Sequence, residues 1–283
     1  MMSFGSEWKG TIAMIKLRNE DIKDNTIKSS KGNQMKWFLN NVWYKADYVG
    51  YEGFSEYLVS KLVKFSNLKE TEFTDYECEE IEYQDNKFAG CKSKNFMPVG
   101  WQLITLERLF MNYYGHSLNS GIYSIESYEN RAKFIVDQTI RMTNLKDFGI
   151  YFSVLMTIDA FFLNEDRHTH NIAVLLDEKG VYHYCPIFDN GASLLSDTKL
   201  DYPLSRDVFS LMRKVKPKTF SDNFDVQLDA VEKLYGKNVH FSFTRKDVEE
   251  IVDRNVFYSR EIKDRVKNLI FEQMRKYKYL LIK

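Results

Sequence analysis

Hydrophobic residues in the first third of the chain mostly follow the two-residue period of β-strands. The run MKWFLNNVWYKADY, residues 35–48, has two β-favouring segments on either side of Asn40-Asn41. Asparagine tolerates the positive φ that a two-residue turn requires, so this run predicts a β-hairpin. YECEEIEY and FAGCKSKNF, residues 76–83 and 88–96, predict two further strands joined over QDNK.

Between these strand pairs, the segment GFSEYLVSKLVKFSN changes to the period of a helix. Its apolar positions recur three or four residues apart, at Phe54, Tyr57, Leu58, Leu62 and Phe65. This spacing predicts an amphipathic helix, with Ser55 or Gly53 as its N-terminal cap.

From residue 101 onward, helical periods dominate. Helices are predicted in WQLITLERLFMNYY (101–114), YENRAKFIVDQTIRM (128–142) and DFGIYFSVLMTIDAFFL (147–163). The last of these is apolar nearly all round, which is typical of a central helix. NIAVLLD and VYHYC then predict a strand pair about a turn at 178–180, and the tail from 207 is helical, with polar breaks near KPKTF and YGKNVHFSF.

A strand-rich part therefore precedes a helix-rich part, which is the order of an α+β fold with two lobes and a cleft between them. We place the boundary between residues 96 and 97. This gives an N-lobe over 1–96 and a mostly helical C-lobe over 97–283.

Composition excludes several classes of protein. The longest apolar stretches are much shorter than the roughly 18–20 residues of a membrane span, and no secretory apolar region follows the first residues, so we expect a cytoplasmic protein without membrane contact. Basic and acidic residues both total 40, which gives no field to attract nucleic acid. The three cysteines favour reduced thiols over a disulfide framework.

The candidate chemistry is concentrated in EDRHTHNIAVL, residues 165–175, and in CPIFDNGASL, residues 185–194. The first segment lies between a predicted core helix and a predicted hairpin, so it forms a loop that is held at both ends. The antiparallel return of the second strand should bring Asn171 close to Asp189. Asp166 could orient a hydroxyl, while Asn171 and Asp189 offer the oxygen ligands that Mg²⁺ prefers. Taken alone, the DRH triplet is also typical of an ion pair at the end of a helix.

Upstream, a second set of charged residues precedes the helical part. Lys45 lies in an otherwise apolar strand, and Glu56 falls in the first turn of the next helix. A lysine can hold phosphate oxygens, and a neighbouring carboxylate can keep it oriented. The loop SSKGNQ, with its single Gly32, would cover whatever Lys45 holds. Each feature by itself is also explained by ordinary structure, so their order along the chain carries the argument.

That order is glycine loop, strand lysine, helix glutamate, helical lobe, Asp-x4-Asn, strand pair and Asp-x-Gly, and it is the order of protein-kinase-like phosphotransferases. Here the sequence resembles the HipA-like serine/threonine kinases. In its compactness it is most similar to the short CtkA type, which lacks the extra N-terminal subdomain. SSKGNQMK resembles the family's S-x-x-G-x-Q-x-K loop, LNEDRHTHN its D-R-H-x-x-N catalytic loop, and PIFDNG its metal segment. The matching positions are Ser29, Gly32, Gln34, Lys36, Lys45, Glu56, Asp166, Arg167, His168, Asn171, Asp189 and Gly191.

The resemblance implies a bilobal protein-kinase-like fold, ATP and Mg²⁺ as cosubstrates, and transfer of the γ-phosphoryl group to a Ser or Thr of a protein. It also implies autophosphorylation of the loop serine, which by position is Ser29, although Ser30 is close enough to be modified instead. An antitoxin-type regulatory protein is a further partner that the family suggests. The sequence departs from ordinary protein kinases, because it has FDN in place of DFG and DRH in place of HRD.

We therefore assign roles to the matching residues. Asp166 orients the attacking hydroxyl, Asn171 and Asp189 hold Mg²⁺, and Lys45, kept in register by Glu56, neutralises the α- and β-phosphates. For Arg167 we favour a structural role. The remaining residues predicted to contact the nucleotide are Ser30, Lys31, Gly32, Asn33, Gln34, Lys92, Phe96 and His168. Adenine is expected against the backbone of CKSKNF, with Phe96 and Val49 as apolar walls.

Three other functions remain open at this point. The same fold could phosphorylate a small molecule, because a fold does not choose its acceptor. It could also be an inactive nucleotide-binding pseudokinase module. A zinc hydrolase built on His168, His170 and His183 is the least favoured, because three converging ligands cannot be placed from the sequence.

Overall fold

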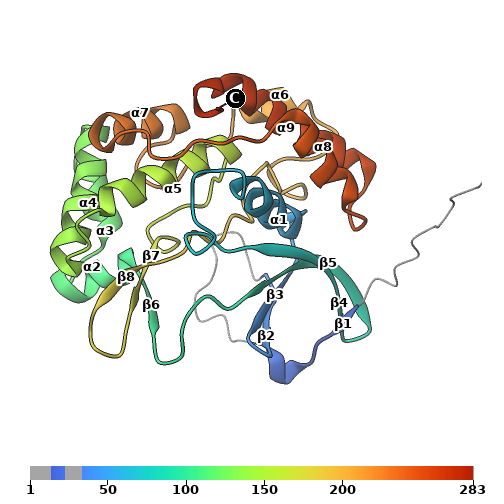
Figure 1. Cartoon of the computed structure of the whole chain (residues 1–283), viewed down its shortest axis with the longest axis horizontal. Helices are drawn as coiled ribbons and strands as arrows, with labels where there is room; N and C mark the ends of the chain where they lie inside the picture. Colours follow the sequence, from blue (N-terminus) through green and yellow to red (C-terminus); the bar gives the residue numbers. More distant parts are fainter. Residues whose placement is uncertain (1–13, 23–33, 283) are drawn as a thin grey trace, which may run out of the picture.

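The computed structural model describes residues 14–22 and 34–282. Its first part is a five-stranded sheet with the strand order β1-β4-β5-β3-β2. The strands are β1 (Ile15–Lys16), β2 (Lys36–Leu39), β3 (Val42–Ala46), β4 (Tyr76–Tyr83) and β5 (Asn86–Lys94), and a 3₁₀ turn covers Asn19–Asp21. Helix α1 (Glu52–Val63) packs against β3, β4 and β5, and Figure 1 shows it between this sheet and helix α8 (Arg245–Arg254), which it also contacts.

Both predicted hairpins of this sheet are confirmed. β2 and β3 pair in an antiparallel register with Lys36 opposite Lys45. Asn40 and Asn41 have φ values of 50° and 62°, so both adopt the left-handed conformation of a two-residue turn. β4 and β5 are antiparallel as well and are joined by a second two-residue turn. The turn chemistry therefore set the register that brings Lys45 to its place in the sheet.

The helix predicted after the first hairpin is confirmed, but its predicted cap is wrong. Helix α1 begins at Glu52, ahead of both Gly53 and Ser55. The Glu52 carboxylate accepts the backbone N–H groups of Val49 and Gly50 at 2.7 and 3.0 Å, so an acidic side chain closes the loop before the helix. Gly53 is needed for close packing instead, because a Cβ there would lie 2.6 Å from the carbonyl carbon of Gly90 in β5.

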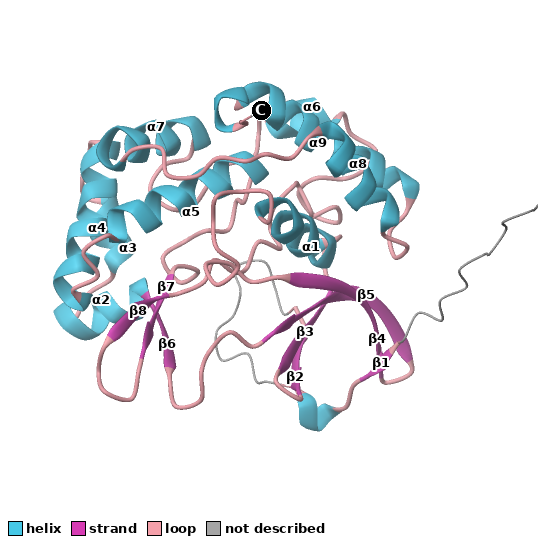
Figure 2. Cartoon of the chain, in the orientation of Figure 1, coloured by secondary structure: helices cyan, strands magenta, loops and turns pink. Residues whose placement is uncertain are grey.

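The second part of the chain combines a small sheet with a layer of helices (Figure 2). Its three strands have the order β6-β7-β8. They are β6 (Gln102–Thr105), β7 (Ala173–Leu176) and β8 (Tyr182–Tyr184), and the last two confirm the predicted strand pair. The prediction of a helix over 101–114 is wrong for its first third, because residues 102–105 pair with β7. The helix begins only at Leu106, where Thr105 accepts the N–H of Arg108 at 3.3 Å.

Helical segments account for most of the remaining chain. They are α2 (Leu106–Tyr114), α3 (Leu118–Tyr123), α4 (Tyr128–Thr143), α5 (Phe148–Phe162), α6 (Val208–Met212), α7 (Phe224–Tyr235), α8 and α9 (Arg260–Lys276), followed by a 3₁₀ turn at Lys278–Leu280. The predicted polar breaks correspond to the connections at 213–223 and 236–244. Among the residues that the structure describes, no helix has the length and apolar character needed to cross a bilayer.

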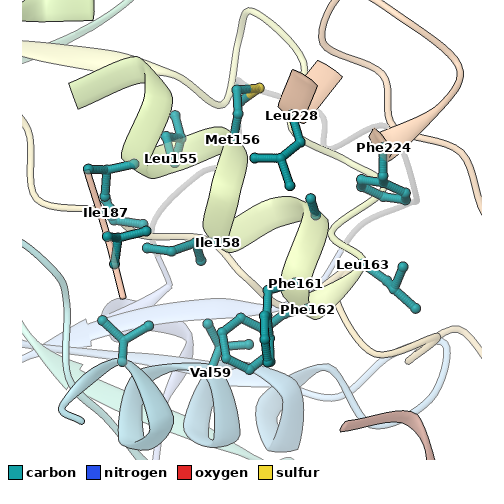
Figure 3. Packing of buried hydrophobic residues seen from close by; sticks show 14 of the residues in the cluster. Val59, Leu155, Met156, Ile158, Phe161, Phe162, Leu163, Ile187, Phe224 and Leu228 are labelled. Carbon is teal, nitrogen blue, oxygen red and sulfur yellow. The ribbon is translucent and has the colours of Figure 1, made fainter. Parts of the chain in front are cut away.

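Helix α5 is the centre of the largest hydrophobic cluster, as its apolar sequence predicts. Phe161 and Phe162 are completely buried, and Figure 3 shows them beside Val59 of α1. The same cluster includes Ile187, which lies two residues before Asp189. The core therefore joins the helix that carries Glu56 to the segment that carries Asp189. The α+β class is confirmed, with a strand-rich first part and a mostly helical second part, while the boundary at residue 96 stays a prediction.

We expect Phe162→Ala to lower the free energy of unfolding by about 3–5 kcal/mol, because it opens a cavity where α5 meets α1. Ile150→Ala is a matched control, since Ile150 lies in the same helix and is 47% exposed. Its cost should stay below about 1 kcal/mol. Denaturant unfolding measures both. Equal losses for the two variants would contradict the central position of α5.

Candidate active site

One lysine joins the sheet, helix α1 and the segment after β8. Lys45 Nζ lies 2.5 Å from Glu56 Oε1 and 2.8 Å from Asp189 Oδ1. The second oxygen of Glu56 accepts the backbone N–H of Asn190 at 2.7 Å, which fixes the segment that carries Asp189. Asp189 itself has φ of 61°, in the left-handed region that Asp and Asn tolerate better than most residues. Three segments that are remote in sequence thus meet at one ammonium group.

Burial and charge act in opposite directions on this group of residues. Burial alone would lower the pKa of Lys45, but the charges of Asp189 and Glu56 raise it well above its ordinary value. Burial would raise the pKa of Asp189, yet the cations of Lys45 and Lys36 hold it well below its usual range. Burial and the nearby charge of Asp189 raise the pKa of Glu56 above its ordinary value, although Lys45 lowers it. Lys45 is therefore a cation and Asp189 a carboxylate at neutral pH.

The loop between α5 and β7 is fixed from within by Arg167. This side chain is buried, and its guanidinium donates to the carboxylate of Asp159 at 3.0 Å. The same guanidinium reaches the carbonyls of Asn171 and Phe188 at 3.1 and 2.7 Å and the Asn190 side chain at 2.8 Å. Arg167 thus ties the DRHTHN loop to the FDN segment, which is the structural role that we favoured for it.

Asp166 and Asn171 lie together within this loop. Asn171 Nδ2 donates to the Asp166 carbonyl at 2.8 Å, and the Asp166 N–H donates to Asn164 Oδ1 at 3.2 Å. The Asp166 carboxylate accepts a hydrogen bond from Lys218 Nζ at 3.0 Å. Because Asn171 uses its amide nitrogen within the loop, its amide oxygen remains available as a ligand.

A cleft brings Asp166, Asn171 and Asp189 to a common space. It is lined by Gln34, Lys36, Tyr48, Val49, Glu52, Asp166, Asn171, Asp189, Gly191, Ala192, Ser196 and Asp197. Residues of the sheet and of the helical part face each other across it. Its polar lining contains three predicted residues of the reaction centre, and Lys45 and Glu56 lie directly behind Asp189.

Other predicted contacts have different positions. Lys92 lies opposite Tyr44 in register, on the face of the sheet away from Lys45, and its ammonium pairs with Glu79 at 2.5 Å. Phe96 packs against Phe188 with ring centroids 5.6 Å apart and does not line the cleft, whereas the other predicted adenine wall, Val49, does.

The remaining predicted residues fall at the edge of the site or beyond the described chain. His168 Nε2 is 3.9 Å from Asp166 Oδ2, and burial lowers the pKa of His168. Ser29, Ser30, Lys31, Gly32 and Asn33 lie outside the described residues, so their roles stay predictions. Gln34, the last residue of the predicted phosphate loop, lines the cleft.

The structure also places residues that the sequence analysis did not assign to the site. Glu107 in α2 is buried and accepts the Thr169 hydroxyl at 2.8 Å, which positions the DRHTHN loop from outside. One acidic residue in an amphipathic helix gives no sequence signal that would assign Glu107 to the site. Lys218 belongs to KPKTF, in which the sequence analysis saw only a polar break in the helical tail.

The three histidines considered for zinc do not gather into one site. His183 Nε2 lies 3.0 Å from Asp177 Oδ2, and its ring stacks on Trp101 with centroids 4.3 Å apart. His168 and His170 contact each other, with ring centroids 5.4 Å apart. Within residues 14–22 and 34–282, no group of three or more His, Cys, Asp or Glu side chains is placed to hold a metal ion.

Comparison with solved structures identifies the fold. The chain is similar to the crystal structure of the Helicobacter pylori proinflammatory kinase CtkA, with a TM-score of 0.57 and 19% sequence identity, over 93% of this chain and 95% of that one. The sequence matches no protein-family model and no curated protein. The likeness shows a kinase-like α+β fold, and membership of the HipA-like family stays a prediction.

We expect Lys45→Met to lower the free energy of unfolding by about 3–5 kcal/mol at pH 7, because it leaves the buried Glu56 and the partly buried Asp189 without their cation. The loss should shrink as the pH falls toward about 4. Without Lys45, burial raises the pKa of both carboxyls, so the folded variant binds protons that the unfolded chain does not and gains stability in acid. The wild type lacks this gain at Asp189, whose pKa is held low.

Denaturant unfolding of both proteins at several pH values measures this difference. Lys87→Met is the matched control, because Lys87 lies in β5 and its side chain is 61% exposed. This control should be nearly neutral at every pH. A loss for Lys45→Met that is constant with pH would show that the two carboxyls do not depend on the lysine.

Proposed function

We propose that this protein is a phosphotransferase that uses ATP and Mg²⁺ to phosphorylate Ser or Thr residues of a protein. The observation that carries the proposal is the ammonium of Lys45, shared between Glu56 and Asp189 at the back of a cleft that Asp166 and Asn171 also line. Phosphoryl transfer requires positioning and charge neutralisation rather than a strong base, and this arrangement offers both. The likeness to a solved kinase supports the same reaction class.

The lysines of the hairpin are suited to bind the nucleotide phosphates. Lys36 and Lys45 are paired across β2 and β3, and Lys36 lines the cleft. Two ammonium groups at this position can neutralise a polyphosphate, while Glu56 holds Lys45 in a fixed orientation. When a nucleotide binds, its phosphate oxygens can then replace part of the salt bridge between Lys45 and Asp189.

Asn171 and Asp189 fit the requirements of Mg²⁺. Both are oxygen donors that line one cleft, and the amide nitrogen of Asn171 is already engaged by the Asp166 carbonyl. Mg²⁺ commonly takes one or two carboxylates and completes its shell with water and phosphate oxygens, so a larger cluster of acids is not needed. Bound there, Mg²⁺ would supply neutralisation of the phosphate charge.

Asp166 is the group that we assign to the acceptor hydroxyl. Its backbone is fixed on both sides, by Asn171 and by Asn164, and its carboxylate lines the cleft. A carboxylate placed there can orient the hydroxyl and take its proton as the new phosphate ester forms. Arg167 and Glu107 hold the loop from behind, so Asp166 does not have to be positioned by the substrate.

The finer assignments rest on the resemblance to HipA-like kinases. They are the choice of a protein Ser or Thr as acceptor, autophosphorylation at Ser29, an antitoxin-type regulatory partner and a cytoplasmic location. An adenine site near the CKSKNF segment, with Phe96 at its edge, belongs to the same set. Phe96 packs on Phe188, one residue before Asp189, which is compatible with a nucleotide that extends from this edge into the cleft.

The test is incubation of the purified protein with γ-labelled ATP and Mg²⁺, with and without a generic protein acceptor. We expect label on protein Ser or Thr, and mass spectrometry should find Ser29 among the modified residues. Asp166→Ala and Asp189→Ala should each lower the rate by a factor of at least about 10²–10⁴. Lys45→Ala should in addition weaken ATP binding by roughly 10-fold or more, as measured by calorimetry.

Asp137→Ala serves as the control, because Asp137 forms an exposed pair with Lys133 on α4. It should label at the wild-type rate. Consumption of ATP without labelled protein would favour a small-molecule acceptor, and ATP binding without turnover would indicate a pseudokinase. Labelling that survives in Asp166→Ala and Asp189→Ala would overturn the assignment of this cleft.

A further inference from the structure

Lys218 is a cation at the reaction centre that comes from a distant segment. Its ammonium lies 3.0 Å from Asp166 Oδ1, and its side chain is 42% exposed while that of Asp166 is 10% exposed. Lys36 and Lys45 belong to the sheet, whereas Lys218 lies on the helical side, in the connection between α6 and α7. It is therefore next to the carboxylate to which we assign the acceptor hydroxyl.

The segment around Lys218 is anchored tightly to the DRHTHN loop. The Thr219 hydroxyl donates to the carbonyl of Arg167 at 2.5 Å. Phe220 is completely buried, its carbonyl accepts from Arg131 at 3.0 Å, and its N–H donates to Gln227 at 2.9 Å. When Lys218 binds a ligand, only its side chain has to be ordered, because the backbone beneath it is already held.

The cations of the loop itself cannot take this position. Arg167 is the only arginine of DRHTHN, and its guanidinium is committed to Asp159 and to two backbone carbonyls. His168 Nε2 lies 3.9 Å from Asp166 Oδ2, which is farther than the 3.0 Å between Lys218 Nζ and Asp166 Oδ1. Lys218, from another segment, brings its ammonium into hydrogen-bond contact with the Asp166 carboxylate.

We propose that the Lys218 ammonium binds the phosphoryl group that is transferred. This inference rests on the proposed function. In the structure, the Lys218 ammonium donates to the Asp166 carboxylate. When ATP is bound, the Lys218 ammonium bridges the Asp166 carboxylate and an oxygen of the γ-phosphate. The geometry supports this because a hydroxyl held by Asp166 must lie close to the phosphorus that it attacks, and Lys218 lies at the same carboxylate.

In the transfer, the acceptor hydroxyl oxygen forms a bond to the γ-phosphorus. The bond between that phosphorus and the oxygen bridging to the β-phosphate breaks, and ADP leaves with the electron pair. The hydroxyl proton passes to the Asp166 carboxylate. Throughout this step, Lys218 donates to a non-bridging oxygen of the phosphoryl group, where negative charge is spread in a loose transition state.

Equilibrium binding of ATP and ADP to the full chain tests the contact without relying on turnover. Lys218→Ala should weaken ATP binding by roughly 10- to 100-fold and change ADP binding by less than about 2-fold, because only ATP carries the γ-phosphate. Lys218→Arg should retain most of the ATP affinity. In the transfer assay, Lys218→Ala should lower the rate by roughly 10²–10³-fold.

A purely electrostatic effect through Asp166 is separated by the same measurement in an Asp166→Asn background. If Lys218 contacts the phosphoryl group, Lys218→Ala still weakens ATP binding there. If Lys218 only neutralises Asp166, the loss disappears in that background, and the proposal is overturned. Thermal unfolding should show that each variant is folded.

Lys216→Ala is the matched control. Lys216 is exposed two residues before Lys218 in the same segment, but it pairs with Asp222 instead of Asp166. We expect it to bind and transfer as the wild type does. Wild-type transfer together with an unchanged ATP-to-ADP preference in Lys218→Ala would overturn this inference alone. A wild-type protein that binds neither nucleotide would overturn the proposed function and this inference with it.

Discussion

The Lys45 ammonium, shared between two carboxylates, is the contact on which the candidate site depends. Glu56 is 11 residues away in the chain and Asp189 is 144 residues away, so the contact closes a cleft between the sheet and the helical part. A buried lysine between two carboxylates is stable only with good geometry, because desolvation penalises all three charges. The rigid neighbours of each partner, including the N–H of Asn190 on Glu56, provide that geometry.

The helical side of the cleft is held by a second buried ion pair. Arg167 and Asp159 fix the DRHTHN loop to the end of α5, and the same guanidinium reaches the carbonyl before Asp189. The two networks therefore meet at the FDN segment. Its backbone is therefore held from both sides. Fixed positions of this kind are the condition for electrostatic preorganisation of the groups that we assign to metal, acceptor and phosphate.

Charged side chains of both signs gather at the cleft. Lys36, Asp166 and Asp189 line it. Asp189 pairs with Lys45 of the hairpin, and Asp166 pairs with Lys218 of the connection between α6 and α7. Cations and carboxylates in one space favour a ligand with several negatively charged groups. The cations can bind these groups directly, and the carboxylates can bind them through a metal ion. A nucleoside triphosphate with Mg²⁺, the ligand that we propose, has this property.

Local chemistry along the chain determined most of the elements. The Asn40-Asn41 turn, the apolar α5 and the strand pair before Asp189 follow from turn propensity and hydrophobic period. The order of the motifs, together with the family resemblance, predicted Lys45, Glu56, Asp166, Asn171 and Asp189 as one set. Tertiary pairing decided the rest. β6 replaced the start of a predicted helix because β7 offered it hydrogen-bond partners, and Lys92 lies on the outer face because strand register fixes the direction of side chains. Lys218 reaches Asp166 across 52 residues, a contact that no local pattern encodes, because it depends on where two separate segments pack.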